Sequence, residues 1–184
     1  MANTKTINIK TTESNGNTNE KEKPGPKKRI VSSSESFTNT YTSIPEDAFQ
    51  YIQQMYENNI IDTEKCNFIQ QQIRQKLYGY RGQDTDKNIF AADQFIKLDQ
   101  VLQLMIESKN RCYYCKECVH VLYENVREPK QWTLDRINNK MGHNQGNLLI
   151  ACLNCNLRRR TMHTERYVFT KQLNIIKVDD SEKI

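Results

Sequence analysis

The spacing of hydrophobic positions predicts helices in the middle of this chain. Between residues 43 and 108, apolar residues recur every three or four positions, as they do on the buried face of an amphipathic α-helix. Three helices are expected: one that begins at Ser43, one from Thr63 to Tyr78, and one from about Ala91 to Ser108. Their inward faces are formed by Phe49, Ile52 and Met55, by Phe68, Ile69, Ile73 and Leu77, and by Phe95, Leu98, Leu102, Met105 and Ile106.

Local signals set the ends of these helices. Ser43 and Glu46 have the spacing of a capping box, and Pro45 suits a first helical turn. The stretch YRGQDTDKN, residues 80–88, is rich in turn formers and is predicted to be the loop between the second and third helices. These helices carry no evident chemistry, so we interpret them as packing elements, with Cys66 as a small buried hydrophobe.

Residues 1–42 have a different composition from the rest of the chain. They are rich in Asn, Thr, Ser, Lys and Glu and have few apolar residues, so they cannot bury enough surface to offset the entropy of ordering. We expect a disordered tail. Its basic stretch KPGPKKR, residues 23–29, is either a nuclear-localisation signal, a nonspecific nucleic-acid contact, or a solvated run of charge.

Composition favours one modest domain with attachments, because 36% of the 184 residues are hydrophobic and 27% are charged. The longest apolar run, Leu148 to Leu153, is much shorter than the roughly 20 residues that cross a bilayer. The first ten residues, MANTKTINIK, lack the hydrophobic region of a signal peptide. A soluble, intracellular protein with no membrane partner is expected.

Positive charge is concentrated in the second half of the chain. The net charge is only +5, but twelve basic residues stand against six acidic ones between Glu107 and Lys171. A surface that binds phosphate groups requires such an excess. Nucleic acid is therefore the favoured partner.

Four of the six cysteines form two CxxC pairs. CYYC at residues 112–115 and CLNC at residues 152–155 are separated by 36 residues. Two such turns can bring four thiolates to one tetrahedral zinc ion and leave no open position, which indicates structural zinc. Free thiols are the alternative, and CYYCKEC leaves open a pair of Cys115 with Cys118. We interpret Cys118 as a spare thiol, and His120 and His163 as packing or exposed residues.

The stretches CYYC, LDRINNKMGHNQGN and IACLNCNLRR, within residues 109–161, resemble the zinc-containing branch of the HNH (ββα-metal) endonuclease superfamily. The resemblance implies an α+β fold in which a treble-clef zinc frame supports a hairpin and a helix, preceded here by about three α-helices. The expected division is a tail at 1–42, a helical segment at 43–108, a zinc and nuclease domain at 109–171 and a C-terminal tail at 172–184.

The resemblance also assigns roles to single residues. Asp135, at the end of a strand-like run, and Asn156, directly after the last cysteine, resemble the ligands of a catalytic Mg²⁺ or Mn²⁺ ion. Asn147 resembles the asparagine whose amide pins the loop between the strands. The physical chemistry agrees, because a hard cation prefers oxygen donors and stabilises charge on a phosphate that is being cleaved. Basic residues that follow on the same helix are expected to bind neighbouring phosphates: Arg158, Arg159 and Arg160.

Arg136 departs from the pattern of many relatives, which have histidine after the aspartate as the general base. A guanidinium stays protonated, so Arg136 cannot accept a proton, but it can grip a phosphate. His143, eight residues after Asp135, is the nearest substitute base; the alternative is a loop histidine that binds phosphate or nothing.

The leading hypothesis is a metal-dependent endonuclease that hydrolyses phosphodiester bonds in DNA. The alternative is a zinc-dependent nucleic-acid-binding module that does not cleave, which Arg136 motivates. A zinc-scaffolded protein-interaction domain explains the cysteines but not Asp135, Asn147 or Asn156. Phage junction-resolving enzymes with a similar zinc frame act on branched DNA as dimers, which adds branched substrates and a homodimer to the expectations.

Overall fold

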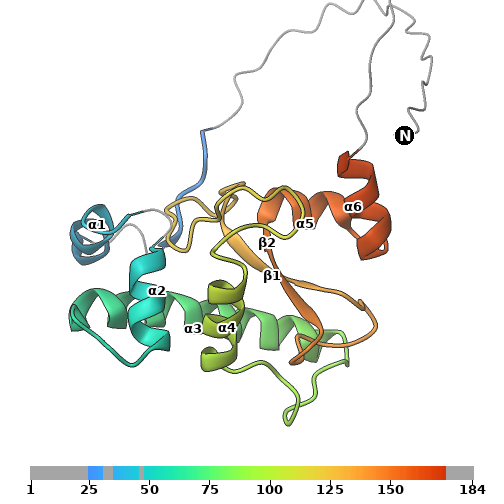
Figure 1. Ribbon diagram of the computed structural model, residues 1–184, viewed down its shortest axis with the longest axis horizontal. Helices are drawn as coiled ribbons and strands as arrows, with labels where there is room; N and C mark the ends of the chain where they lie inside the picture. The colour runs from blue at the N-terminus through green and yellow to red at the C-terminus, as the bar shows by residue number, and fades with distance from the viewer. Residues whose placement is uncertain (1–24, 31–34, 46–47, 173–184) are drawn as a thin grey trace, which may run out of the picture.

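The computed structural model describes residues 25–30, 35–45 and 48–172, and combines helices with one small sheet (Figure 1). Two strands pair antiparallel, with Trp132 opposite Cys152 and Arg136 opposite Leu148. The α+β class expected from the sequence is confirmed. The elements in chain order are α1 (Glu35–Thr42), α2 (Phe49–Tyr56), α3 (Thr63–Asp86), α4 (Leu98–Glu107), β1 (Trp132–Arg136), β2 (Leu148–Cys152), α5 (Leu153–Arg159) and α6 (Thr164–Gln172).

The long helix α3 lies along strand β1 (Figure 1). Four residues advance a helix by about 6.0 Å and two residues advance a strand by about 6.7 Å, so every fourth α3 residue meets every second β1 residue. The pairs in contact are Lys76 with the Trp132 carbonyl, the Tyr80 hydroxyl with the Leu134 N–H, and Asp84 with Arg136. One face of the hairpin is therefore covered by α3.

The short helix α5 packs on the other face of the hairpin, and it begins directly where β2 ends. Thr133 links these elements, because its hydroxyl donates to the Ala151 carbonyl at 2.8 Å and accepts from the Asn156 side chain at 3.0 Å. Since side chains alternate along a strand, Thr133 and Asp135 face α5 while Leu134 and Arg136 face α3. The hairpin is thus enclosed between two helices, and Trp132 and Leu134 are fully buried.

The first predicted helix begins later than its sequence signals indicated. Helix α2 starts at Phe49, after Ala48 in a left-handed conformation with φ 49°, and no side chain caps it. The hydroxyl of Ser43 instead donates to the Thr40 carbonyl at 2.8 Å, at the end of α1. Ser43 therefore closes the preceding helix, and Glu46 lies outside the described residues.

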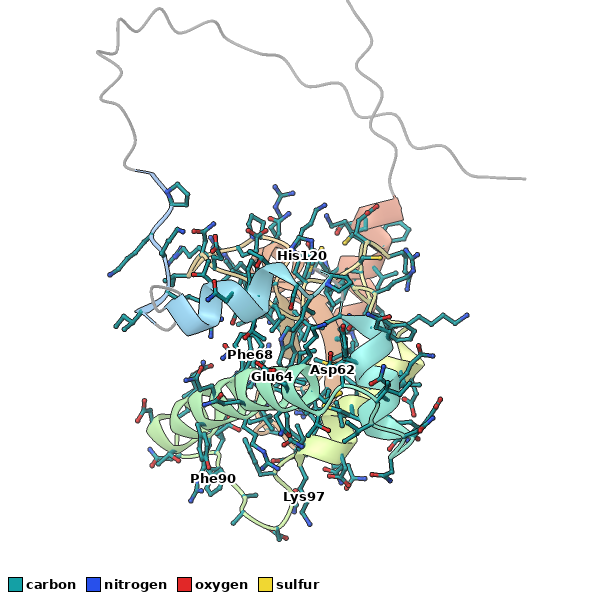
Figure 2. The ribbon with its side chains drawn as sticks, turned by 90° about the vertical axis from the view of Figure 1, so that its left-hand side faces the viewer. Asp62, Glu64, Phe68, Phe90, Lys97 and His120 are labelled. Atoms are coloured by element: carbon teal, nitrogen blue, oxygen red, sulfur yellow. The ribbon has the colours of Figure 1, made fainter. Side chains whose placement is uncertain are left out.

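Helix α3 begins where it was predicted and continues further than expected. Asp62 accepts a hydrogen bond from the Lys65 N–H at 3.0 Å and caps the helix, as its place at the helix start in Figure 2 illustrates. Residues 80–86, expected to form a loop, continue the helix to Asp86. Tertiary contacts override the turn propensity of this stretch, because Tyr80 and Asp84 are both buried against the hairpin.

Helix α4 is shorter than the predicted third helix and begins at Leu98. The residues before it pair with the hairpin loop. Phe95 forms an isolated bridge with Asn144, and the Ile96 N–H donates to the His143 carbonyl at 2.9 Å. Backbone groups that bond to another segment cannot take part in helix hydrogen bonds, so the apolar spacing of this stretch was misleading.

The expected tail is structured in the part that the structure describes. The Arg29 N–H donates to the Glu124 carbonyl at 2.8 Å, and the Val126 N–H donates to the Lys27 carbonyl at 2.9 Å. Glu35–Thr42 forms α1. The expectation of disorder thus differs from the structure for residues 25–30 and 35–42, while residues 1–24 and 173–184 lie outside the described residues. Among the described helices, none has both the length and the apolar character that crossing a bilayer requires.

Candidate metal centre and hairpin site

Four cysteines converge at the junction of β2 and α5. The Sγ atoms of Cys112, Cys115, Cys152 and Cys155 all lie within 4.8 Å of one another, and those of Cys115 and Cys152 are 3.9 Å apart. Four sulfurs at about 2.3 Å from one zinc ion in a tetrahedron would be about 3.8 Å apart. The donor set and its spacing fit a structural zinc ion, as the two CxxC pairs predicted.

Local backbone geometry shapes each half of this cluster. In the first pair, the Lys116 N–H donates to the Cys112 carbonyl at 2.9 Å, and Lys116 has φ 62°, so the chain turns back tightly. In the second pair, the Cys155 N–H donates to the Cys152 sulfur at 3.4 Å in the first turn of α5. Backbone N–H groups aimed at sulfur favour the thiolate form, which is the form that binds metal.

The close approach of the four thiols favours a bound cation at the centre of the cluster. A hydrogen bond from Cys152 lowers the pKa of Cys112 to about 4, whereas burial and the nearby Cys112 charge raise the pKa of Cys155 to about 11. One thiolate therefore opposes ionisation of its neighbours, and a bound dication removes that opposition. Cys118 is exposed and outside the cluster, and Cys66 is buried on α3.

The carboxylate of Asp135 is enclosed, and both of its oxygens accept hydrogen bonds. Arg159 binds it through two parallel contacts, Nε to Oδ2 and Nη2 to Oδ1, each 2.6 Å long. The Tyr114 hydroxyl donates to Oδ2 at 2.6 Å, and burial together with this carboxylate raises the pKa of Tyr114, which keeps the donor protonated. Only 3% of Asp135 is exposed. Asp135 thus fastens α5 to β1 in this structure.

Arg159 differs from its two neighbours in the arginine run. It is 2% exposed, and besides Asp135 it donates to the carbonyls of Met162 and Arg136, each at 2.7 Å. Arg158 and Arg160 are exposed. In this structure the Arg159 guanidinium faces the interior and binds Asp135, whereas its two neighbours face solvent.

Asn156 lies in α5, on the same face of the hairpin as Asp135. Its Nδ2 donates to the Thr133 hydroxyl at 3.0 Å, and within the described part of the chain its Oδ1 has no protein partner. An amide oxygen in this state is available to a hard cation. The structure therefore brings Asn156 and Asp135 to one side of β1, although the oxygens of Asp135 are engaged.

Asn147 closes the loop between the strands. Its Oδ1 accepts from the Asn138 N–H at 2.9 Å, and its Nδ2 donates to the carbonyls of Asn138 and Gly142 at 3.1 and 3.0 Å. Both ends of one buried amide are thus used on the loop backbone. This is the loop-pinning geometry that the resemblance implied.

His143 lies on the α3 side of the hairpin, away from the face that carries Asp135. Its Nδ1 is 2.8 Å from Asp84 Oδ1, its backbone N–H donates to Asp84 Oδ2 at 2.5 Å, and its ring stacks on Tyr80 with centroids 4.3 Å apart. Burial lowers the pKa of His143 below its ordinary value, although the bond to Asp84 opposes this. The structure does not bring His143 to Asp135.

Asp84 is the site residue that the sequence interpretation missed. It is fully buried, binds both the ring and the backbone of His143, and lies 3.9 Å from the Arg136 guanidinium. Gly142 gives it room, because a Cβ there would be 2.8 Å from Asp84 Oδ2 and 2.6 Å from the Ile89 carbonyl. The signal was the helical spacing of residues 76, 80 and 84, which the turn formers obscured.

Arg136 faces Asp84 and is only partly buried. Its Nη1 donates to the Met141 carbonyl at 3.1 Å, and 12% of its side chain is exposed. A guanidinium has five donors, so these contacts leave others for a phosphate at the end of β1.

Comparisons with known proteins add no relative to these observations. A scan against protein-family models, a search of curated proteins and a search of solved structures each gave no match.

Proposed function

We propose that this protein is a metal-dependent endonuclease that hydrolyses phosphodiester bonds in DNA through an HNH-type site. The observation that carries the proposal is the placement of Asp135 on β1 and Asn156 on α5, on one face of a hairpin whose second strand ends at a four-cysteine cluster. A zinc-framed hairpin followed at once by a helix is the arrangement that a treble-clef ββα-metal site needs.

The structural zinc ion fixes the junction of β2 and α5. Cys152 ends the strand and Cys155 lies in the first turn of the helix, so binding both to one ion sets the angle at which α5 leaves the sheet. That angle decides whether Asn156 faces β1. We therefore assign zinc a supporting role outside the chemistry.

A second, hard cation would be held by Asp135 and Asn156. When bound, Mg²⁺ or Mn²⁺ neutralises charge on the scissile phosphate and on the leaving oxygen. Asn156 offers an oxygen that bonds to none of the described residues, whereas Asp135 has to release Arg159 before it can bind the ion. A dication on the Asp135 carboxylate replaces the single charge of the guanidinium with a double charge, which offsets the loss of the Arg159 contacts.

The remaining residues act on the DNA phosphates. Arg136, Arg158 and Arg160 supply positive charge at the strand end and on the outer face of α5, where they bind and orient the backbone. Because His143 is held behind the hairpin by Asp84, we assign it to positioning the loop and take solvent as the acceptor of the proton from the attacking water. The water oxygen bonds to phosphorus while the bond from phosphorus to the leaving oxygen breaks, and the leaving oxygen takes a proton from solvent.

A second candidate is a zinc-dependent nucleic-acid-binding module that does not cleave, and the bidentate pair of Asp135 with Arg159 favours it. Incubating the purified zinc-loaded protein with supercoiled plasmid, with and without Mg²⁺ or Mn²⁺, separates the two. The proposal expects nicking only with the added cation. Plasmid binding without nicking under every metal condition would reject cleavage and favour the binding module.

A further inference from the structure

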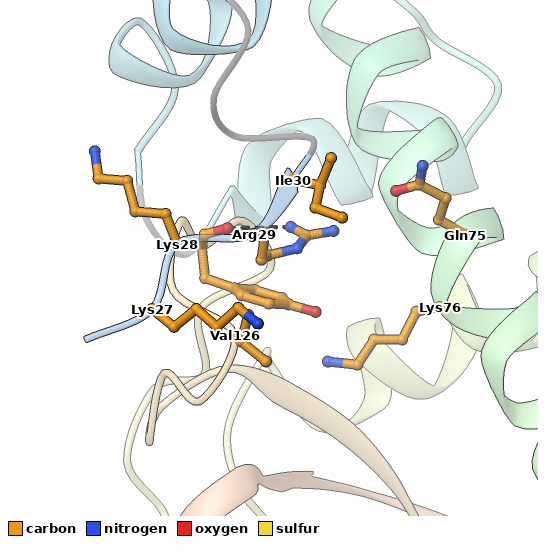
Figure 3. Close-up of a pocket in the computed structure, with 8 residues that line it drawn as sticks. Lys27, Lys28, Arg29, Ile30, Gln75, Lys76 and Val126 are labelled. Carbon is orange, nitrogen blue, oxygen red and sulfur yellow. Dashed lines mark hydrogen bonds between the residues drawn. The ribbon is translucent and has the colours of Figure 1, made fainter. Parts of the chain in front are cut away.

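A basic pocket of about 460 Å³ lies where the N-terminal segment meets α3 and the loop before β1 (Figure 3). It is remote in sequence from the residues assigned to cleavage. Four of its eight lining residues are basic and none is acidic. The lining residues are Lys27, Lys28, Arg29, Ile30, Gln75, Lys76, Tyr123 and Val126.

Backbone hydrogen bonds hold the N-terminal segment in place. The Arg29 N–H donates to the Glu124 carbonyl at 2.8 Å, the Val126 N–H donates to the Lys27 carbonyl at 2.9 Å, and Lys28 pairs with Asn125 as an antiparallel bridge. These contacts add the segment to the loop like a short strand. Residues 27–30 are therefore docked on the body of the protein with their side chains around the pocket.

Two cations share one aromatic ring inside the pocket. The Arg29 guanidinium carbon is 4.4 Å and the Lys76 Nζ is 4.7 Å from the centroid of the Tyr123 ring. Lys76 donates to neutral acceptors, Gln131 Oε1 at 2.9 Å and the Trp132 carbonyl. Burial, and after it the charge of Arg29, holds the pKa of Lys76 well below its usual range. An anion bound beside Arg29 and Lys76 would restore the charged form of Lys76 and offset the repulsion between the two basic groups, so the pocket favours an anion.

We propose that this pocket binds a phosphate of the DNA backbone and forms a second contact with the DNA that the hairpin site engages. The inference rests on the proposed function for the identity of the ligand. Lys76 contacts the Trp132 carbonyl, and Asp135 is three residues further along β1, about 10 Å along the strand. That span corresponds to roughly three nucleotides of one B-DNA strand, so one backbone can pass both places.

The pocket is expected to bind the DNA backbone whatever the base sequence. Removing a lysine or arginine that binds phosphate weakens binding to all sequences alike. Each phosphate contact contributes about 0.9 to the slope of log K against log salt concentration. Lys28 and Arg29 are the residues to change, because Lys76 is half-buried, bonds to the Trp132 carbonyl, and its loss would disturb β1 as well.

The test is the salt dependence of binding by the full chain. Fluorescence anisotropy with a labelled 20-base-pair duplex, without divalent cation so that nothing is cleaved, would compare the parent with Lys28→Gln/Arg29→Gln. The matched control is Lys109→Gln/Arg166→Gln, which removes the same charge from two exposed positions elsewhere. The pocket variant should lose about 0.9 of slope per phosphate contact. Its Kd relative to the parent should then change about eightfold per lost contact between 0.1 and 1 M salt.

The outcomes are distinct. A smaller slope in the pocket variant and an unchanged slope in the control support the inference, even if the parent never nicks DNA and the nuclease proposal fails. Equal losses in both variants would mean that only overall charge matters, and this overturns the inference. An unchanged slope in the pocket variant, or no binding of the duplex by the parent, overturns it as well.

Discussion

Replacing Arg159 with alanine should destabilise the protein strongly. Arg159 and Asp135 are 1% and 3% exposed in their side chains and share two contacts of 2.6 Å. Removing the guanidinium leaves a buried carboxylate that keeps the hydrogen bond from the Tyr114 hydroxyl and loses both contacts with Arg159. Removing one partner of a buried ion pair costs about 3 to 5 kcal/mol, so the free energy of unfolding should fall by that amount.

Urea unfolding of the zinc-loaded protein at pH 7, followed by circular dichroism, measures this loss. Arg158→Ala is the matched control, since Arg158 is exposed on the same helix and its loss should change the free energy of unfolding by less than about 0.5 kcal/mol. Asp135→Asn combined with Arg159→Ala should recover part of the loss, because no buried charge remains. An Arg159→Ala protein as stable as Arg158→Ala would refute the reasoning that this pair fastens α5 to the hairpin.

Three further predictions concern zinc, the loop and pH. Cys152→Ser should lose zinc and unfold residues around the cluster while Cys118→Ser keeps a full equivalent; elemental analysis checks this, and zinc loss from Cys118→Ser alone contradicts it. Gly142→Ala should lower the free energy of unfolding by about 1 to 3 kcal/mol, because its Cβ would be 2.6 Å from a backbone carbonyl, whereas Gly82→Ala, in open space within α3, should raise it by about 0.5 to 1 kcal/mol. Burial lowers the pKa of His143 in the folded protein. The contribution of neutral His143 to the free energy of unfolding is therefore fully present above about pH 6.5 and is lost as the pH falls through the pKa of the folded state. Denaturation at pH 7 and pH 5 should therefore show a larger loss in the parent than in His143→Gln, and equal losses would contradict that assignment.

The zinc frame could be predicted from the sequence because metal chemistry fixes both residue type and spacing. Two CxxC pairs are typical of a structural zinc site, and the four sulfur atoms lie close together in the structure. The sequence also indicated that Asn147 lies in the loop between the strands and Asn156 on the helix that follows the last cysteine pair, and both residues lie there.

The arginine run could not be resolved from residue type alone. Arg158, Arg159 and Arg160 are chemically equivalent, and only the phase of α5 separates them. Arg159 is four residues after the buried Cys155 and therefore points inward. Helical phase was thus the available signal, but the partner of Arg159 is 24 residues away on β1 and depends on the folded hairpin.

The role of Asp84 was hidden for a different reason. Gly82 and the polar residues around it favour a turn in isolation, whereas burial of Tyr80 and Asp84 against the hairpin stabilises helix. Local propensity cannot include contacts with a loop 59 residues further along the chain. Predicting the end of α3 therefore required the tertiary structure.

The central claim is that Asp135 holds the cation used in cleavage, and nicking of supercoiled plasmid by Asp135→Asn in Mn²⁺ tests it most directly. The variant should be compared with the parent at equal zinc content and equal DNA binding, with Asp99→Asn on the exposed side of α4 as the matched loss of one carboxylate. The account predicts that the parent and Asp99→Asn nick the plasmid while Asp135→Asn does not. Cleavage by Asp135→Asn at the rate of the parent would contradict it.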